Sequence, residues 1–458
     1  MTLVPDPLLA PLPSGLPEVK HHARIPAGFT AAGTTSGIKP SGRPDFSLVA
    51  ATGGAVPAAG VFTPNRVPAA PVRLSRANLR ATGGGEATCG VARAVVATSG
   101  CANAATGAAG DADQAAIGVA VASALGCRPQ EVLHLSTGVI GTRLPVDVVT
   151  AEVARVAPGG LAPTDDALLA AAASLRTTDS VTKVATVAVT LPAAAGGTVA
   201  CTVTGICKGV GMIHPRMATL LALVLTDATA SPETLRDLLR RAAATTWDQL
   251  SVDGDTSTND TVLLLASGAA GAASADDDPD TRAALGRAIE AVARDLARQQ
   301  ARDGEGASSL ITCQVSGAAD DADARAVARA VISSSLVKAA IHGRDANWGR
   351  IAGAAGNATL AEAAVLEAAG LAPGVAAGRA GQPAALDPDR MRIAIAGQVA
   401  YDGPAGGPAG IDKAAAREAL AADEVLIRLD LGLGDGTGEA FGCPLTEGYV
   451  KENAEYTT

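Results

Sequence analysis

Aromatic side chains are scarce in this sequence: Phe, Trp and Tyr together make up 2% of its 458 residues. Glycine is abundant instead, with 52 residues, and so is alanine. A core that lacks aromatic rings must be built from small aliphatic side chains, which pack closely but bury less apolar area per residue. We therefore expect compact layers with close backbone approach. The chain is long enough for two core-forming units.

Long apolar runs and basic runs are also absent. The longest apolar segment near the middle, around residues 220–225, is too short for a membrane span, which needs about 20 apolar residues. The first 22 residues contain prolines and an aspartate where a secretory signal has a basic start and an unbroken apolar stretch. A net charge of −10 without clustered Lys and Arg argues against a nucleic-acid partner. We expect a soluble, cytoplasmic protein.

Cysteine and histidine are few and scattered. The seven cysteines are odd in number and include no C-x-x-C pair, which favours reduced, buried thiols over a disulfide framework. The five histidines show no metal-ligand spacing. An acid-rich loop at residues 253–260 lacks the pattern and the closing glutamate of a calcium loop, and we interpret it as structural. No metal and no cofactor are expected.

Several regular elements can be predicted from local patterns. Residues 184–191 and 198–206 are rich in β-branched side chains and flank a Gly-rich turn, which predicts a β-hairpin. Ser231, Pro232 and Glu233 form a strong helix start, and this helix should run to about Trp247. Ala-rich periodicity predicts two further helices, over residues 280–302 and 321–341. Because no βαβ rhythm repeats, the pattern favours α+β over a doubly wound sheet.

Residues 208–228, KGVGMIHPRMATLLALVLTDA, join a loop containing Gly and Pro to an apolar run that begins at Thr219. The Thr219 hydroxyl is suited to attack the carbonyl of Ala218 in an N-to-O acyl shift, and hydrolysis of the ester would free the Thr219 α-amine. Such an amine has an ordinary pKa of roughly 7.7–8, so it can serve as a general base at neutral pH. Most threonines at strand starts are structural, so the residues alone favour the structural interpretation.

The same segment resembles the cleavage segment of the ornithine acetyltransferase family, the glutamate N-acetyltransferases of arginine biosynthesis. In that family the cut falls within a Met-Ala-Thr triplet, which is Met217-Ala218-Thr219 here. Further segments resemble the family in the same order along nearly the whole chain. They are AAGTTSGIKPSGRPDFSLV, AGVFTPNRVPAAPV, STGVIGTRLP (136–145), DGDTSTNDTVLLLASG (253–268), GRDANWGRI (343–351) and YVKENAEYTT (449–458).

The resemblance implies a role for several single residues. Thr219 would be the nucleophile after cleavage between Ala218 and Thr219, while Thr137 and Gly138 would form the oxyanion hole. The implied substrate contacts are Thr177, Lys208, Thr219, Glu305, Asn453 and Thr458. Lys208 suits an α-carboxylate and Glu305 suits the cationic side of ornithine. The register at Thr177 stays open, because Thr178 is adjacent. A terminal segment is normally frayed, so the matching tail should fold into the site.

The implied fold is layered α+β, with mostly antiparallel β-sheets between helices. The implied enzyme consists of fragments 1–218, with an irregular leader at 1–24, and 219–458, which stay associated as a heterotetramer of two copies each. By a ping-pong reaction it would move acetyl from N2-acetylornithine to glutamate, both small amino-acid substrates, without metal or nucleotide. Acetyl-CoA as a further acetyl donor stays open, because no residue decides it.

Two alternative functions remain open, and a few residues depart from the family pattern. An N-terminal-nucleophile aminopeptidase or amidase of similar fold would use water as the acceptor, and a non-catalytic protein or a secondary-metabolism paralogue would keep the fold alone. Cys101 stands where asparagine is expected. His214 and Arg216 flank the cleavage site, and Arg216 replaces a smaller residue. These departures leave substrate preference and cleavage rate open.

Overall fold

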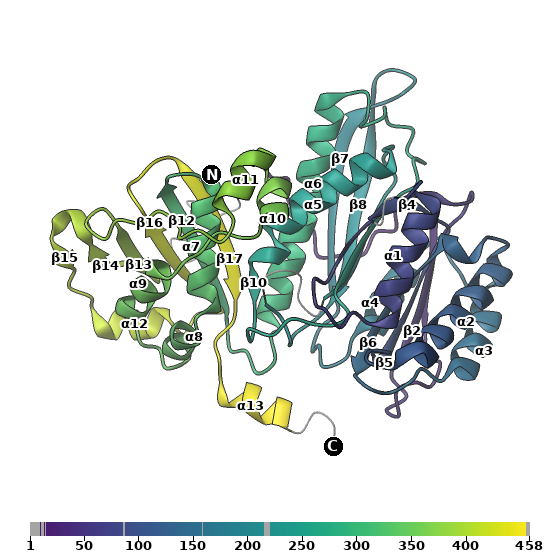
Figure 1. The fold of residues 1–458 in the computed structure, drawn as a ribbon, viewed down its shortest axis with the longest axis horizontal. Helices are drawn as coiled ribbons and strands as arrows, with labels where there is room; N and C mark the ends of the chain where they lie inside the picture. The colour runs from purple at the N-terminus through teal and green to yellow at the C-terminus, as the bar shows by residue number, and fades with distance from the viewer. Residues whose placement is uncertain are drawn as a thin grey trace.

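The computed structural model describes residues 10 and 13 and residues 15–85, 88–157, 159–214 and 220–454. Three predicted site residues, Ala218, Thr219 and Thr458, lie outside these ranges, as does Arg216. The described residues form three β-sheets with helices packed on them, which confirms a layered α+β fold. Figure 1 shows two lobes: two of the sheets form the larger one, and the third sheet forms the smaller.

The first sheet has the strand order β1-β2-β5-β6. Its strands are β1 (Phe29–Thr34), β2 (Phe46–Ala51), β5 (Ala94–Cys101) and β6 (Val132–Val139). β1, β2 and β5 pair antiparallel, and β6 lies parallel to β5. The carboxyl end of β6 carries Thr137 and Gly138, so this sheet brings the predicted oxyanion residues to its edge.

The second sheet has the order β4-β3-β11-β9-β8-β7. Its strands are β3 (Val56–Phe62), β4 (Cys89–Ala92), β7 (Lys183–Pro192), β8 (Thr198–Lys208), β9 (Leu221–Thr226) and β11 (Thr261–Ala266). The β7–β8 hairpin is the predicted one, extended at both ends. β8 and β9 pair antiparallel with Lys208 opposite Leu221, so both ends of the intervening loop lie side by side in one sheet.

These two sheets stack face to face, as the shared apolar cluster of Leu133, Leu223 and Leu263 shows. Their outer faces are covered by α2 (Gly107–Leu125) and α3 (Val146–Val156) on the first sheet and by α5 (Pro232–Thr245) and α6 (Pro279–Arg302) on the second. α4 (Asp165–Leu175) packs against β1 and β2 of the first sheet, and α1 (Ala70–Thr82) lies beside β6. The larger lobe is therefore an α/β/β/α sandwich (Figure 1).

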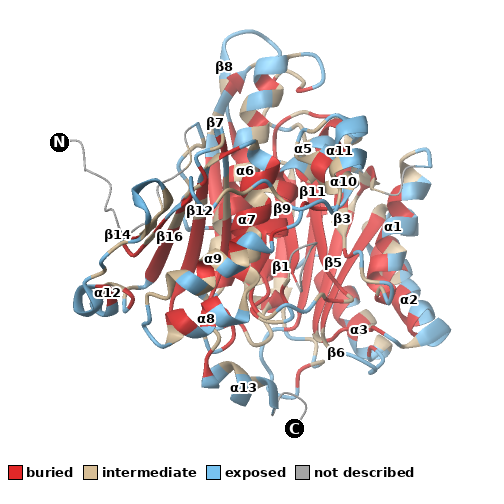
Figure 2. Cartoon of the chain, turned by 60° about the vertical axis from the view of Figure 1, so that its left-hand side comes forward, coloured by how far each residue is buried: buried red, intermediate tan, exposed pale blue. Residues whose placement is uncertain are grey.

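Small residues allow the close approach that the composition predicts. A side chain on Gly33 of β1 would collide with the backbone of Ala170 in α4. A side chain on Gly205 of β8 would meet Val292 and Leu296 of α6 at less than normal contact distance. The strands are accordingly buried, and exposure is confined mainly to loops and outer helix faces (Figure 2). The expectation of close-packed layers is confirmed.

The third sheet has the order β10-β17-β12-β16-β13-β14-β15. Its strands are β10 (Leu250–Ser251), β12 (Leu310–Ala318), β13 (Arg392–Ile395), β14 (Gln398–Asp402), β15 (Gly407–Pro408), β16 (Glu424–Asp430) and β17 (Gly436–Gly442). α7 (Asp321–Ser333) and α9 (Trp348–Gly356) pack on one face. The remaining helices are α8 (Ser335–His342), α10 (Ala363–Ala368), α11 (Pro373–Arg379), α12 (Lys413–Ala419) and α13 (Glu447–Ala454). Antiparallel pairings predominate in the fold, as predicted.

The helix predictions succeed with one exception. α5 begins at Pro232, and the Ser231 side chain accepts a hydrogen bond from the Thr234 backbone, as an N-cap should. α6 covers the second predicted helix. The continuous helix predicted over residues 321–341 was wrong: Ser334 adopts an extended conformation that ends α7, and its side chain caps α8. A serine competes well for such a cap, because its hydroxyl bonds to nearby backbone groups.

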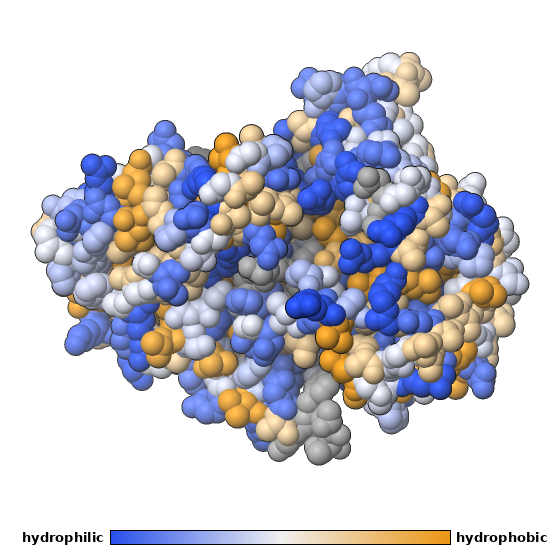
Figure 3. Space-filling model, viewed as in Figure 1, coloured by the Kyte–Doolittle hydropathy of each residue, from blue (hydrophilic) through white to orange (hydrophobic). Residues whose placement is uncertain are grey.

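In the described part of the chain, every helix is too short or too polar to cross a membrane. On the face shown in Figure 3, hydrophobic residues appear in small groups dispersed among hydrophilic ones. Trp247, one of two tryptophans, is fully buried, and its indole N–H donates to Gln300 at 3.1 Å. This hydrogen bond joins the segment after α5 to α6.

Candidate active site

A cavity of about 280 Å³ lies where the ends of β6 and β8 meet the turn after α6 and the C-terminal helix α13. All six predicted site residues that the structure describes line it: Thr137, Gly138, Thr177, Lys208, Glu305 and Asn453. These residues come from segments far apart in the sequence, so their convergence is a property of the fold. The predicted Ala218, Thr219 and Thr458 lie outside the described residues.

Lys208 is the last residue of β8 and is buried. Its ammonium nitrogen lies 3.4 Å from the Thr137 hydroxyl oxygen and 3.9 Å from a carboxylate oxygen of Asp179. Burial lowers the pKa of Lys208, and the negative charge of Asp179 opposes that effect. A buried ammonium with one side open to a cavity is a strong partner for an anionic group of a ligand.

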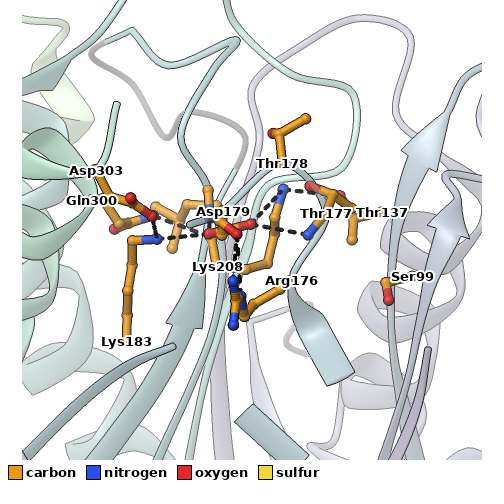
Figure 4. A network of polar contacts seen from close by, with 12 residues as sticks. Ser99, Thr137, Arg176, Thr177, Thr178, Asp179, Lys183, Lys208, Gln300 and Asp303 are labelled. Carbon is orange, nitrogen blue, oxygen red and sulfur yellow. Dashed lines mark hydrogen bonds and ion pairs between the residues drawn. The ribbon is translucent and has the colours of Figure 1, made fainter. Parts of the chain in front are cut away.

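Asp179 holds this corner of the cavity together (Figure 4). One carboxylate oxygen accepts hydrogen bonds from the Lys183 ammonium at 2.8 Å and from the Gly209 backbone at 2.9 Å. The other accepts from the Thr177 backbone at 3.0 Å. Burial alone would raise the pKa of Asp179, but the charges of Lys208 and Lys183 hold it well below its usual range. Asp179 thus fixes two predicted substrate contacts, Thr177 and Lys208.

Sequence reasoning missed Asp179, although a signal was present. Lys183 and Lys208 lie just outside the two predicted hairpin strands, at the ends of β7 and β8, and a buried lysine needs an acid partner. Asp179 is the acid that immediately precedes that hairpin. The structure adds a second acid, Asp303, whose carboxylate lies 2.5 Å from the Lys183 ammonium. The charges at this corner therefore alternate in sign.

Thr137 and Gly138 end β6, beside the end of β5. Gly138 has a φ of +133°, and a side chain there would collide with the Gly100 carbonyl group. Only glycine meets both constraints at this position. The Gly138 backbone therefore comes unusually close to the neighbouring strand while lining the cavity, an arrangement that suits donors aimed at a developing oxyanion.

Glu305 closes the opposite side of the cavity. Its two carboxylate oxygens accept hydrogen bonds from the Thr178 hydroxyl and from the Asn453 amide, both at 2.8 Å. Gly211 approaches so closely that any side chain there would strike the carboxylate. The carboxylate is therefore held by groups from three segments. Thr177 and Thr178 both line the cavity, but it is the Thr178 hydroxyl that contacts Glu305.

The tail reaches the site through α13, which brings Asn453 to Glu305. Tyr449 of the same helix donates a hydrogen bond from its hydroxyl to Asp253 at 3.3 Å. No residue of α13 is buried, so these polar contacts, rather than apolar packing, place the helix. The predicted folding of the tail into the site is therefore observed as far as residue 454.

The acid-rich loop of residues 253–260, interpreted from the sequence as structural, supports the cavity. Asp253 accepts hydrogen bonds from the Met212 and Ile213 backbones at 2.5 and 2.9 Å. Asn259 donates from its amide to the carbonyls of Ala102 and Ser136. Asp260 accepts a hydrogen bond from the Leu220 backbone at 2.9 Å. This loop therefore fixes the described residues on both sides of residues 215–219.

Asp260 is a second residue that sequence reasoning left without a role. Its side chain is fully buried, and burial raises the pKa of its carboxyl group well above the usual value. Its second oxygen has no hydrogen-bond partner among the described residues. Cys101, by contrast, points its thiol toward the Thr142 carbonyl and does not line the cavity. His214 contacts the Ser251 hydroxyl at 3.3 Å.

Comparison with known proteins gives a consistent result. A model of the ArgJ family matches residues 30–458. The arginine biosynthesis bifunctional protein ArgJ of Thermosynechococcus vestitus is 43% identical over 94% of this chain and 96% of its own length. The protein of the same name from Thermus thermophilus is 41% identical over 95% of this chain and 99% of its own. The one from Mycolicibacterium paratuberculosis is 41% identical over 94% and 96%.

Two solved structures are also similar. A crystal structure of the arginine biosynthesis bifunctional protein argJ from Bacillus halodurans is 38% identical, with a TM-score of 0.43, over 51% of this chain and 97% of that one. A crystal structure of ornithine acetyltransferase complexed with ornithine, from Mycobacterium tuberculosis, is also 38% identical, with a TM-score of 0.37. It covers 44% of this chain and 99% of that one.

Proposed function

The chain belongs to the ArgJ family, and on that premise we propose that it moves an acetyl group from N2-acetylornithine to glutamate through an ester on Thr219. It is an acetyltransferase of arginine biosynthesis. The observation that supports the specific reaction is the convergence of the six described site residues on one cavity of about 280 Å³, a size suited to an amino acid.

The first proposed step is self-cleavage. The Thr219 oxygen attacks the Ala218 carbonyl carbon, the peptide C–N bond breaks, and the acyl group moves to oxygen. Water then hydrolyses the ester, which leaves an Ala218 carboxylate and a free Thr219 α-amine. Support comes from the flanking contacts: Asp253 holds the backbone of Ile213, and Asp260 holds that of Leu220. These two contacts fix described residues that lie close to the proposed cut on either side of it.

The second proposed step is acetylation of the enzyme. The Thr219 α-amine accepts the hydroxyl proton while the oxygen attacks the acetyl carbonyl of N2-acetylornithine. Negative charge develops on the carbonyl oxygen, where donors at Thr137 and Gly138 would stabilise it. The C–N bond then breaks, the departing amine takes the proton, and ornithine leaves. The ammonium of Lys208 beside the Thr137 hydroxyl adds positive charge to this side of the cavity.

The third proposed step transfers the acetyl group to glutamate. Its α-amine attacks the acetyl-Thr219 ester, the ester C–O bond breaks, and the threonine oxygen regains its proton. Donor and acceptor share an α-amino-acid head, so one set of contacts can serve both half-reactions. Lys208 would bind the α-carboxylate, and Glu305, which also lines the cavity, would bind the cationic group of ornithine.

The two fragments, 1–218 and 219–458, would remain associated after the cut, as a heterotetramer of two copies each. The pairing of β8 with β9 supports their association, because these neighbouring strands belong to different fragments. The apolar clusters of the larger lobe likewise draw residues from both. Acetyl-CoA as a further donor is a separate activity that would need its own assay.

An aminopeptidase or amidase with the same kind of nucleophile is the main rival. Water would then replace glutamate as the acceptor. The contacts that hold Glu305 in place favour an amino-acid substrate with a cationic end. A non-catalytic relative or a secondary-metabolism paralogue would share the fold but not the reaction.

Two measurements test the proposal. Intact mass of the purified protein should show two fragments, and Thr219→Ala should give one uncut chain. Cleaved enzyme given N2-acetylornithine should release ornithine at a rate that depends on glutamate, with N-acetylglutamate formed in equal amount. Ornithine release at a rate independent of glutamate would contradict the transferase proposal and favour an amidase. Cleavage of the Thr219→Ala variant would contradict the assignment of Thr219 as the nucleophile.

A further inference from the structure

The side chain of Asn259 lies in the wall of the candidate active site and is buried. Its amide nitrogen donates to the Ala102 carbonyl at 2.7 Å and to the Ser136 carbonyl at 2.8 Å, and its amide oxygen accepts from the Thr258 hydroxyl at 2.6 Å. A primary amide has two N–H donors, so both are used within the protein. The influence of Asn259 on the site therefore passes through the two carbonyl groups that it holds.

These two carbonyl groups lie on both sides of the predicted oxyanion pair, residues 137–138. Ser136 directly precedes the pair in β6. Ala102 follows β5, and its backbone N–H donates to the carbonyl of Val139, directly after the pair, at 3.0 Å. Asn259 therefore holds the residue before the oxyanion pair and, through Ala102, is connected to the residue after it.

Gly138 needs a restraint of this kind. Glycine has no side chain to limit its backbone, and Gly138 has a φ of +133°. β6 is the last strand of its sheet, so only one of its edges pairs with another strand. Donors that stabilise an oxyanion are effective only when they are fixed in place before the charge develops. The bonds from Asn259 add a restraint that comes from the second sheet, at the loop before β11.

The next residues extend this connection toward the proposed nucleophile. Asp260 accepts a hydrogen bond from the Leu220 backbone at 2.9 Å, and the Thr261 backbone donates to the Leu220 carbonyl at 3.0 Å. Leu220 directly follows Thr219 in the sequence. Consecutive residues of one strand entry therefore bind the oxyanion segment, through Asn259, and the segment after the nucleophile, through Asp260.

We propose that Asn259 is a positioning residue for acyl transfer, which holds the donors at Thr137 and Gly138 where the carbonyl oxygen of the acyl group becomes charged. The inference rests on the proposed function and adds a residue to it. Both half-reactions pass through a charged carbonyl oxygen, which forms only in the transition state. Displaced donors should therefore lower kcat and leave KM nearly unchanged, whereas general loosening of the cavity would also raise KM.

The kinetics of ornithine release from N2-acetylornithine test the proposal. Release is measured with and without glutamate, because an oxyanion forms whether glutamate or water accepts the acetyl group. Rates are divided by the concentration of cleaved enzyme, which intact mass provides. In Asn259→Ser one hydroxyl donor replaces two amide donors, so kcat should fall at least about ten-fold while KM stays within about three-fold of wild type. Asn259→Ala should lose at least as much in kcat.

Asn78→Ser and Asn78→Ala are matched controls. Asn78 of α1 is also buried, and its amide nitrogen donates to two carbonyl groups, those of Pro129 at 3.2 Å and Val132 at 2.7 Å. Val132 begins β6, so Asn78 holds the opposite end of the same strand and does not line the cavity. The controls should lower the melting temperature and keep kcat within about three-fold of wild type.

The proposal is overturned if Asn259→Ser keeps the wild-type kcat, if its KM rises as much as its kcat falls, or if Asn78→Ser loses kcat equally. It is also overturned if Asn259→Ser folds but never cuts itself, since the residue would then act in cleavage. Should Asn259→Ala fail to fold, by its melting curve, Asn259→Ser decides, and failure of both variants to fold would make the residue purely structural. Wild type that releases no ornithine would instead contradict the proposed function, and this inference with it.

Discussion

The Lys208 ammonium lies 3.4 Å from the Thr137 hydroxyl, although 71 residues separate them in the sequence. Lys208 ends a strand of the second sheet and Thr137 lies at the end of a strand in the first. The contact therefore bridges the two sheets of the sandwich at the edge where the cavity opens. Because each partner comes from a rigid strand, the geometry of the candidate site depends on how the sheets stack.

Gly138→Ala should abolish acetyl transfer. The residue has a φ of +133°, and its new methyl group would collide with the Gly100 carbonyl, so the end of β6 must shift. Gly141→Ala is a matched control, because Gly141 also has a positive φ, of +85°, but has open space around it. The control should lose about 1–3 kcal/mol of stability and keep its transfer rate. Equal transfer rates in the two variants would contradict the oxyanion assignment.

Asp179→Asn should damage both stability and substrate binding. The buried ammonium groups of Lys183 and Lys208 would lose their shared carboxylate, which should cost about 3–5 kcal/mol in the free energy of unfolding. The KM for N2-acetylornithine should rise as Lys208 loses its orientation. Asp303→Asn is the control, since Asp303 contacts Lys183 but not Lys208. The same rise in KM in Asp303→Asn would show that the effect on KM comes from general destabilisation of this region and not from the orientation of Lys208.

Asp179 also predicts an acid-side loss of stability. Its pKa is lowered in the folded protein, so its contribution is fully present above the unfolded value of about 3.9 and is lost as the pH falls below it. Chemical denaturation at several pH values should therefore show a steeper decline below about pH 4 in wild type than in Asp179→Asn. Parallel pH profiles for the two proteins would contradict the assigned direction of the shift.

Glu305→Gln should selectively weaken binding of the cationic substrate. The amide keeps the shape of the carboxylate but not its charge, so inhibition by ornithine should weaken by at least about ten-fold while the KM for glutamate changes less. Glu452→Gln is the control, because Glu452 lies near Glu305 and lines only the neighbouring cavity. Initial-rate kinetics with both substrates varied provides the measurement. An equal change for ornithine and glutamate would remove the assigned role.

Asp260→Ala should slow self-cleavage by at least about ten-fold, because the Leu220 backbone loses its buried hydrogen-bond acceptor. Asp260→Asn keeps an acceptor oxygen and should cleave at a rate within about three-fold of wild type. The fraction of uncut chain is followed by gel electrophoresis after expression, and melting curves show whether each variant is folded. Loss of cleavage in the Asn variant would instead assign the carboxylate a direct part in the chemistry.

How far the sequence predicts the structure depends on the range of the interaction. Ser231 and Pro232 start α5 as expected, because a cap is a local interaction. The β7–β8 hairpin is equally local, and it forms where predicted. The resemblance also identified residues that meet at one cavity. Local pattern alone gives no reason for Thr137 and Lys208 to meet, since that contact depends on how the two sheets stack.

The failures have physical causes as well. The helical periodicity of residues 321–341 continues through Ser334, so pattern analysis gave no reason for a break there. The break arises because the Ser334 hydroxyl caps the following helix. Asp179 was missed because its importance comes from two lysines on a neighbouring hairpin, not from its own surroundings in the sequence. Asp260 was noticed only as part of an acidic loop, and its contact with Leu220 requires the folded sheet.

The pairing of β8 with β9 has a consequence for the life of the protein after the proposed cut. Before cleavage, the second sheet forms within one chain, so its folding is a unimolecular reaction. Afterwards the same sheet would join two polypeptides, and refolding from denaturant would become a bimolecular reaction between pieces that each lack part of the core. Cleavage would thus replace unimolecular folding by assembly of two fragments, and the persistence of the enzyme would depend on how slowly it unfolds.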